Sequence, residues 1–283
     1  GTESYSLTGL SGETNYNWIA PAGATITSGQ GTDGIVATFD SYNQDTSVQL
    51  TVIASNDCPN SENTIVLDID VSADPELALI SGSDLVELCY SESLTPIVYE
   101  LRGGTDNVSI EWFVGGVSVA PPSGIQFTDN TTTIEVSGTY DTSLIEDKTY
   151  TYVLTATNLS CTNTFVEDGT ITFLATPTAV LEVGSDDDQS VCEGVNIEDI
   201  RYNFSNTTNY SFNWTGTIPT GFTTNFDSIN NVLSITGTAQ EVSQTTTFTY
   251  EISNENNVTG CAGEVLTGQI TVNADGELTL DSS

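Results

Sequence analysis

The five cysteines are the residues whose types and spacing point most directly to chemistry in this sequence of 283 residues. Cys89 and Cys192 each precede a recurring tyrosine by ten residues, and Cys161 and Cys261 each follow a long tyrosine-containing segment. Each of two repeated segments therefore holds one early and one late cysteine. The spacing predicts two disulfides within repeats, Cys89–Cys161 and Cys192–Cys261. Each would close a loop of about 70 residues and stabilise its repeat by about 4 kcal/mol. Bonds of this kind are typical of extracellular proteins.

Cys58 occupies the late position of the first repeated segment. Its early partner would lie ten residues before Tyr5, which is ahead of Gly1, so we expect Cys58 to be a free thiol. A naturally unpaired cysteine is the alternative. A catalytic thiol is disfavoured, because the chain has no His and only three Lys or Arg that could lower the thiol pKa.

The ionisable residues exclude several functional classes. The chain carries 39 Asp and Glu against 3 Lys and Arg, a formal charge of −36, so its surface repels nucleic acid and anionic membranes. Without His there is no His-based triad and no imidazole ligand for a metal. Because the carboxylates are scattered over expected turns and outward strand positions, they favour a solvated surface over the paired acids of a hydrolase. We expect no enzyme activity.

Acidic residues near the expected joints between repeats suggest a bound cation. Carboxylate oxygens gathered at a joint suit Ca²⁺, which takes six to eight oxygen ligands, and the ion would stiffen the joint. A bare acidic turn is the alternative, because the run does not match the spacing of an EF-hand loop. The candidate ligands are Asp74, Glu76, Asp84, Asp186, Asp187 and Asp188.

Three copies of one pattern organise the chain. A tyrosine couplet begins each copy, and a tryptophan follows Tyr5 and Tyr99 by 13 residues and Tyr202 by 12. Such a constant place in an alternating strand predicts a core side chain between two sheets, rather than a platform for sugar stacking. The three predicted core residues are Trp18, Trp112 and Trp214.

Apolar residues alternate with Thr, Ser, Asn or Glu throughout the copies, and Gly, Pro, Asn and Asp fill the gaps. This pattern predicts an all-β chain of tandem immunoglobulin-like antiparallel sandwiches arranged as an elongated rod. The expected domains are residues 1–73, truncated at the N-terminus, 74–177 and 178–274. Residues 275–283 form a linker or the start of another repeat. Proline at each internal boundary would stiffen the linker.

Two motifs suggest a family. Residues 16–26 and 28–32, which read YNWIAPAGATI and SGQGT, resemble the PKD-like repeat of Bacteroidota surface proteins. Residues 218–222 and 233–238, which read IPTGF and LSITGT, resemble repeats of the very large SprB-type gliding-motility adhesins of those bacteria.

The resemblance implies export by the type IX secretion system and display on the outer membrane as a filament that attaches to surfaces or polysaccharides. We therefore expect a force-bearing repeat segment of an extracellular adhesin. Its partners would be neighbouring repeats and surface polysaccharide, with no membrane insertion, and the segment would be monomeric. The alternative is a set of carbohydrate-binding modules appended to a secreted hydrolase, which would show two or more exposed aromatic rings on one face.

Overall fold

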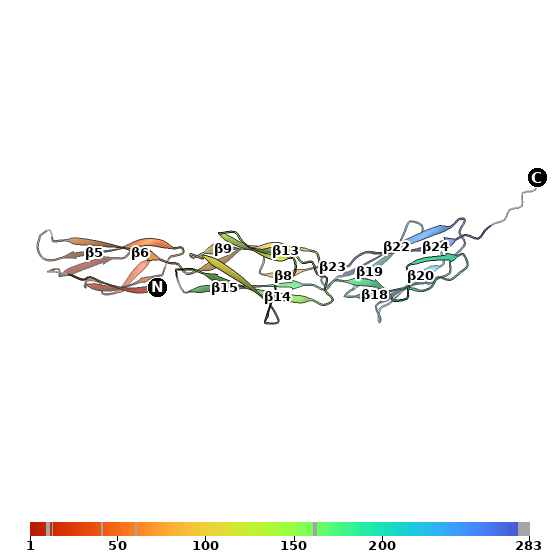
Figure 1. The fold of residues 1–283 in the computed structure, drawn as a ribbon, viewed down its shortest axis with the longest axis horizontal. Coiled ribbons are helices and arrows are strands. Elements are labelled where there is room, and N and C mark those ends of the chain that lie inside the picture. Colours follow the sequence, from red (N-terminus) through yellow and green to blue (C-terminus); the bar gives the residue numbers. More distant parts are fainter. Residues whose placement is uncertain (10–11, 13, 41, 60, 161–162, 277–283) are drawn as a thin grey trace, which may run out of the picture. The chain divides into compact units, whose positions relative to one another are not determined.

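The alternating segments form β-strands throughout the computed structural model, which describes residues 1–9, 12, 14–40, 42–59, 61–160 and 163–276 (Figure 1). Strand β14 (Lys148–Thr157) shows the principle, because its Tyr150, Tyr152, Leu154 and Ala156 are buried and the residues between them are not. One face of the strand therefore packs in a core and the other meets water. In the described residues no helix is long and apolar enough to cross a membrane.

The strands form three pairs of sheets, which we call the first, second and third repeats. The first repeat has sheets β1-β4-β3 and β2-β5-β6. Trp18, Phe39 and Leu50 lie in its core. Its strands are β1 (Thr2–Ser6), β2 (Asn15–Ile19), β3 (Ala24–Ser28), β4 (Gly34–Phe39), β5 (Thr46–Ser55) and β6 (Asn63–Val71).

The second repeat has sheets β12-β13-β9-β7 and β11-β10-β14-β15-β8. Its other strands are β7 (Glu76–Ser81), β8 (Leu85–Leu88), β9 (Ser93–Arg102), β10 (Asn107–Val114), β11 (Val117–Val119), β12 (Ile125–Asp129), β13 (Thr133–Thr139) and β15 (Thr164–Phe173).

The third repeat has sheets β16-β18-β21-β20 and β17-β24-β22-β19, with β23 beside β22. Its core includes Tyr202, Leu233 and Tyr250. Its strands are β16 (Thr178–Leu181), β17 (Asp188–Cys192), β18 (Ile200–Ser205), β19 (Asn209–Thr215), β20 (Phe222–Asp227), β21 (Val232–Gly237), β22 (Thr246–Asn256), β23 (Cys261–Ala262) and β24 (Leu266–Asn273).

In the third repeat β17 runs parallel to β24, which departs from the antiparallel arrangement that the sequence predicts. The chain crosses from one sheet at β16 to the other at β17. In doing so it covers the edge of β24, whose backbone groups would otherwise face solvent.

The chain folds into two compact units whose boundary passes through the second repeat. Unit 1 holds residues 1–85, 94–138 and 150–170, which include the whole first repeat. Unit 2 holds residues 86–93, 139–149 and those from 171 onward, which include the third repeat.

A pair of buried tyrosines lies in the core of both later repeats. The hydroxyls of Tyr99 and Tyr152 are 3.0 Å apart, and those of Tyr202 and Tyr250 are 3.1 Å apart. A glycine faces one ring of each pair, and a Cβ at Gly169 or Gly268 would overlap the ring of Tyr152 or Tyr250. Each buried hydroxyl thus has a hydrogen-bond partner inside an apolar core.

Burial is the main reason that these four tyrosines resist ionisation. It raises the pKa of Tyr99, Tyr152 and Tyr202, and it raises the pKa of Tyr250 to about 12. In an unfolded chain tyrosine ionises near pH 10. The unfolded state therefore loses a proton at a lower pH than the folded state does.

Ionisation of Tyr250 should not affect the free energy of unfolding of the full chain below about pH 10. We expect that free energy to fall between about pH 10 and 12, where Tyr250 is ionised in the unfolded state but not in the folded state. Urea unfolding across this range measures the fall. In Tyr250→Phe the fall should be shallower, because one linked proton is removed. The substitution Thr247→Ala, at an exposed site on the same strand, should leave the slope unchanged. An equal slope in Tyr250→Phe would contradict the linkage.

Candidate functional site: the joints between repeats

The joint between the first and second repeats lies within unit 1 and centres on the Asp45 carboxylate. The backbone N–H of Ala73, in the linker after β6, donates to Asp45 Oδ1 at 2.8 Å. The Asn158 side-chain amide, which follows β14, donates to the same oxygen at 3.2 Å and to the Ala73 carbonyl at 3.0 Å. One carboxylate and one amide therefore fasten the linker to both repeats.

The approach of the two repeats at this joint requires small residues. The N–H of Gly103, which follows β9, donates to the Asn43 carbonyl at 3.2 Å. A Cβ at Gly104 would overlap the side chain of Asp45. Asn158 is only 3% exposed, so its hydrogen bonds are shielded from water, which raises the cost of breaking them.

The joint between the second and third repeats lies within unit 2 and repeats one contact of the first joint, an aspartate that accepts from the N–H of a linker alanine. Here the N–H of Ala175 donates to Asp147 Oδ1 at 2.7 Å. The Asn206 side-chain amide donates to the Ile145 carbonyl at 2.9 Å and to the Thr176 carbonyl at 3.3 Å. Asn206, like Gly103 in the first joint, has a positive φ and follows the strand that contains the tyrosine couplet of its repeat.

A covalent bond is added at the second joint. Cys89, directly after β8, forms a disulfide with Cys261 in β23, and their Cα atoms are 5.5 Å apart. The two cysteines are 172 positions apart in the sequence. The bond therefore joins the second repeat to the third and does not close a loop inside either.

This connectivity corrects the predicted pairing. Cys192 is a free, exposed thiol, and Cys89 bonds to Cys261 rather than to Cys161, which lies outside the described residues. Cys192 pairs with Asn273 at the far end of β24, whereas Cys261 lies just before the start of that strand. The strand of eight residues separates them by roughly 23 Å, beyond the 7 Å that a disulfide allows between Cα atoms. Cys58 is also a free, exposed thiol.

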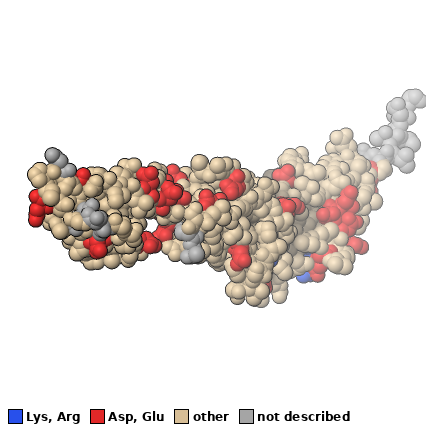
Figure 2. Space-filling view, turned by 60° about the vertical axis from the view of Figure 1, so that its left-hand side comes forward, with Lys and Arg blue, Asp and Glu red and all other residues tan. Residues whose placement is uncertain are grey.

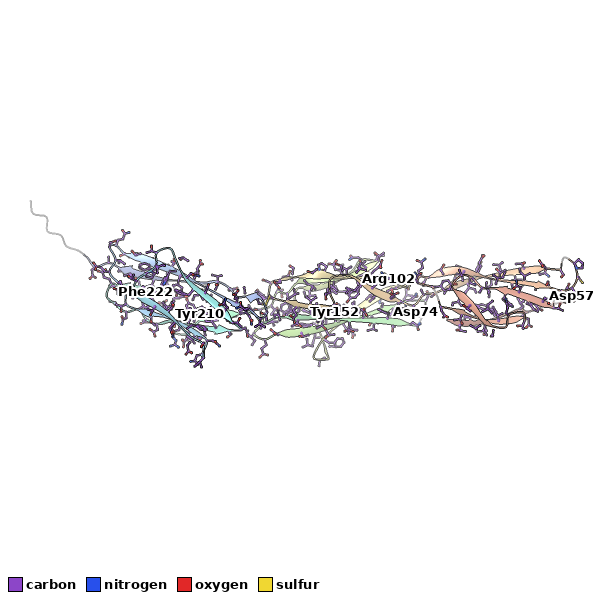
Figure 3. All side chains as sticks on the ribbon, turned by 180° about the vertical axis from the view of Figure 1, so that it is seen from behind. Asp57, Asp74, Arg102, Tyr152, Tyr210 and Phe222 are labelled. Atoms are coloured by element: carbon purple, nitrogen blue, oxygen red, sulfur yellow. A yellow bond between two sulfur atoms is a disulfide. The ribbon has the colours of Figure 1, made fainter. Side chains whose placement is uncertain are left out.

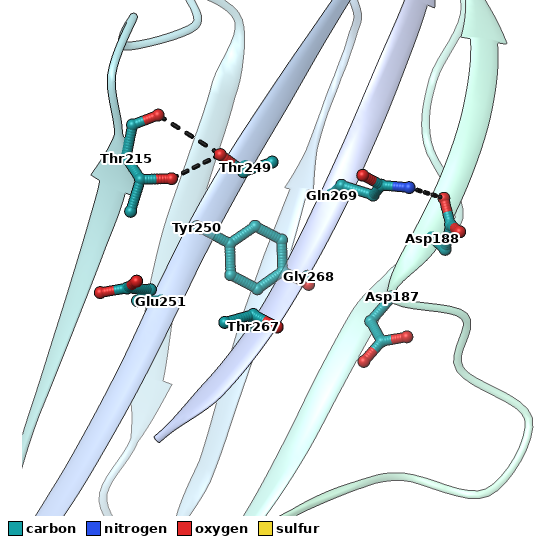
Figure 4. A pocket seen from close by; sticks show the side chains of 9 residues that line it. All are labelled: Asp187, Asp188, Thr215, Thr249, Tyr250, Glu251, Thr267, Gly268 and Gln269. Carbon is teal, nitrogen blue, oxygen red and sulfur yellow. Dashed lines mark hydrogen bonds between the residues drawn. The ribbon is translucent and has the colours of Figure 1, made fainter.

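The run of acidic residues in the third repeat makes hydrogen bonds with the protein itself. Asp186 accepts from the backbone N–H of Asp188 at 3.1 Å, as in a tight turn, and Asp187 accepts from the Tyr202 hydroxyl at 3.1 Å. Asp188 accepts from the Gln269 amide at 2.8 Å on the rim of an open pocket (Figure 4). Each of the three carboxylates therefore has its own partner.

The other predicted metal ligands lie near the first joint and in the second repeat. Asp74 accepts from the Asn163 amide at 2.6 Å, and the backbone N–H of Glu76 donates to the Thr105 hydroxyl. The Asp84 carbonyl accepts from Thr170 beside β8. Among the residues that the structure describes, no three acidic or thiol side chains are placed to hold one metal ion. Calcium binding at the joints stays a prediction, and no role of these residues depends on it.

The three tryptophans lie in or against the cores. Trp18 is 5% and Trp112 is 4% exposed. Trp214 is half-buried and packs against Phe222 and Tyr250, with ring centroids 6.1 and 5.5 Å away. All three rings are occupied by core contacts.

Sequence reasoning missed the joint carboxylates, Asp45 and Asp147. A signal was present, because each precedes the alanine that it binds, Ala73 or Ala175, by 28 residues. Among many acidic residues this spacing has meaning only when the strand order is known. Figure 2 shows how widely the other carboxylates are spread over the visible surface.

Comparison with known proteins agrees with this architecture. Residues 1–69 match the family model of a PKD-like domain. The chain is similar to the titin I-band fragment I67–I69, with 14% identity, a TM-score of 0.56, and coverage of 98% of this chain and 93% of the fragment. An E-to-A variant of the three-domain titin fragment I67–I69 gives 13% identity and a TM-score of 0.54 over the same shares. No curated protein matches the chain.

The chain is therefore an all-β series of tandem immunoglobulin-like domains, and its residues 1–69 are similar to a PKD-like domain. PKD-like domains are usually extracellular. These comparisons support the PKD-like part of the sequence resemblance.

We expect Asp45→Ala to raise the hydrogen-exchange rate of the Ala73 amide about 10- to 100-fold, because a hydrogen bond to a charged group contributes about 1.5–3 kcal/mol. Asp45→Asn keeps an acceptor oxygen and should have a smaller effect. The matched control is Asp70→Ala, which removes an exposed carboxylate from β6. Unchanged Ala73 exchange in Asp45→Ala would show that the carboxylate does not hold the linker.

Proposed function

We propose that this chain is a force-bearing repeat segment of an extracellular bacterial adhesin filament, of the gliding-motility type that the sequence resembles. The observation that carries the proposal is the Cys89–Cys261 disulfide, which joins neighbouring repeats. A disulfide inside a domain protects that domain alone. A disulfide between domains decides how load passes along the chain.

The load path follows from the connectivity. When the chain is pulled from its two ends, tension runs along residues 1–89, crosses the sulfur–sulfur bond and continues from residue 261. Residues 90–260 lie outside this path, so they cannot be drawn out while the bond is intact. Most of the second repeat and most of the third are protected in this way.

The polar joints complement the covalent bond. Asp147 and Asn206 hold the linker and the end of β18 against the second repeat. These hydrogen bonds resist bending and twisting, whereas the disulfide limits extension. The first joint is also held by hydrogen bonds, which are made by Asp45 and by the Gly103 N–H.

Charge and redox chemistry fit an extracellular filament. A formal charge of −36 keeps neighbouring filaments from associating through their sheet edges. Disulfides form and persist in oxidising compartments. Export by the type IX system, attachment to the outer membrane and binding of polysaccharide are further parts of the proposal, and they are supported by the resemblance to adhesin repeats.

The alternative, a set of carbohydrate-binding modules, requires a face with several exposed aromatic rings. Among the described large apolar residues that are exposed, the aromatic one is Tyr90, at 38%. Tyr210 and Phe222, in the third repeat (Figure 3), are partly buried and pack against its core. The described surface therefore favours a spacer over a sugar-binding face.

Single-molecule stretching of the full chain from its termini tests the proposal. We expect the fully unfolded oxidised chain to be shorter than the reduced chain by roughly 580 Å, because 172 residues at about 3.4 Å each stay behind the disulfide. The variant Cys89→Ser should reach the longer extension without reductant.

Cys192→Ser is the matched control, because it removes an exposed free thiol and should keep the short extension. Equal extensions for the oxidised wild type and Cys89→Ser would overturn the proposed load path.

A further inference from the structure

Cys192 occupies in the third repeat the place that Cys89 occupies in the second. Each follows or ends a short strand, β8 or β17, at the edge of a sheet beside the last strand of its repeat. The Leu88 carbonyl accepts from Leu174 at 2.9 Å, and Cys192 pairs with Asn273. Both cysteines therefore lie beside the end of the last strand of their repeat, where the chain leaves that repeat.

The backbone after the two cysteines follows the same path. Glu92 N–H donates to the Cys89 carbonyl at 3.2 Å, and Val195 N–H donates to the Cys192 carbonyl at 3.2 Å. Both segments are thus turns of the same length that start at the cysteine.

The third residue of each turn is anchored in the same way. Ser91 and Gly194 have φ values of 63° and 79°. Their N–H groups donate to the carbonyls of Tyr140 and Ala239 at 3.3 and 2.8 Å, which lie in equivalent segments after β13 and β21. The surroundings of the free thiol therefore copy those of the bonded one.

The late cysteines lie at the opposite end of a repeat. In the first repeat Asn56, which follows β5, accepts from the backbone N–H of Cys58 at 2.9 Å. In the third repeat Asn256, the last residue of β22, accepts from the backbone N–H of Val258 at 3.0 Å, three residues before Cys261. In Figure 3, Asp57, which precedes Cys58 in the sequence, lies at one end of the first repeat. Asp74, in the linker to the second repeat, lies at the opposite end. A late cysteine thus faces away from the following repeat.

We propose that Cys192 is one half of a second inter-repeat disulfide, whose other half is the late cysteine of a following repeat of the same kind. The bond copies Cys89–Cys261 one repeat further along the chain. The early cysteine of each repeat bonds to the late cysteine of the next, and successive repeats become a continuous covalent ladder.

Formation of the bond needs a disulfide oxidant, for which oxidised glutathione is the probe. The Cys192 thiolate attacks one sulfur of glutathione disulfide and releases one glutathione thiolate. The late cysteine thiolate then attacks the Cys192 sulfur and releases the second. Two protein thiols are oxidised, and one glutathione disulfide is reduced to two thiols.

This inference extends the proposed function, because a ladder would carry the covalent load path through more than two repeats. Its test reads the pattern of sulfur bonds in unloaded protein. The stretching experiment reads extension at the bond that already exists. Either result can therefore fail without the other.

The test uses the full chain to Ala274 followed directly by a second copy of residues 176–276, which reproduces the Ala175–Thr176 linkage. The appended copy carries Cys192→Ser, so that every Cys192 peptide comes from the first copy, and Val258→Leu at an exposed site, so that its Cys261 peptide has a different mass. After oxidation with glutathione disulfide, free thiols are alkylated and the protein is digested at acidic residues. Mass spectrometry should find Cys192 of the first copy bonded to Cys261 of the appended copy, with almost no alkylated Cys192. The Cys89–Cys261 peptide in the same digest shows that the joint has folded.

Two variants sharpen the result. Cys58→Ser removes the other exposed thiol of the described structure and should leave the new bond intact, whereas Cys192→Ser should abolish it and leave the appended Cys261 alkylated. Alkylated Cys192 beside an intact Cys89–Cys261 bond would overturn the proposal. So would Cys192 bonded between separate molecules, or the absence of the Cys89–Cys261 bond that serves as its template.

Discussion

The disulfide between Cys89 and Cys261 constrains the second joint more tightly than any other interaction. A sulfur–sulfur bond forms only when the two Cα atoms come within about 7 Å, so the end of the second repeat and the start of the third must already meet. The hydrogen bonds of Asp147 and Asn206 to linker and loop backbone hold them there. Non-covalent contacts thus raise the effective concentration of the two thiols, and the bond makes the arrangement permanent.

Local patterns were sufficient to predict the strands and the cores. Alternation of period two reports which face of a strand is buried, and this holds for β14 and β22 residue by residue. The tyrosine couplets were equally informative, because Tyr99 and Tyr202 occupy the same core position in successive repeats. These features depend only on residues that are close together in the sequence, so they can be predicted from it.

The cysteine pairing could not be predicted in the same way. Spacing showed which cysteines are equivalent, but equivalence does not say at which end of a sandwich each one lies. Cys192 ends β17 and Cys261 precedes β24, and the parallel pairing of these strands puts the two at opposite ends of the sheet. The joint residues Asp45 and Asn158 were missed for a related reason, since they are 113 positions apart and meet only after both repeats have folded.

The two joints perform one task with different means. At the first, a single buried amide, Asn158, reaches both the carboxylate and the linker carbonyl. At the second, Asn206 of the third repeat donates to the carbonyls of Ile145 and Thr176, and a disulfide is added. A hydrogen-bonded joint can open and close again under load, whereas a covalent one cannot. In the described structure the second joint therefore keeps its two repeats connected even where its hydrogen bonds are broken.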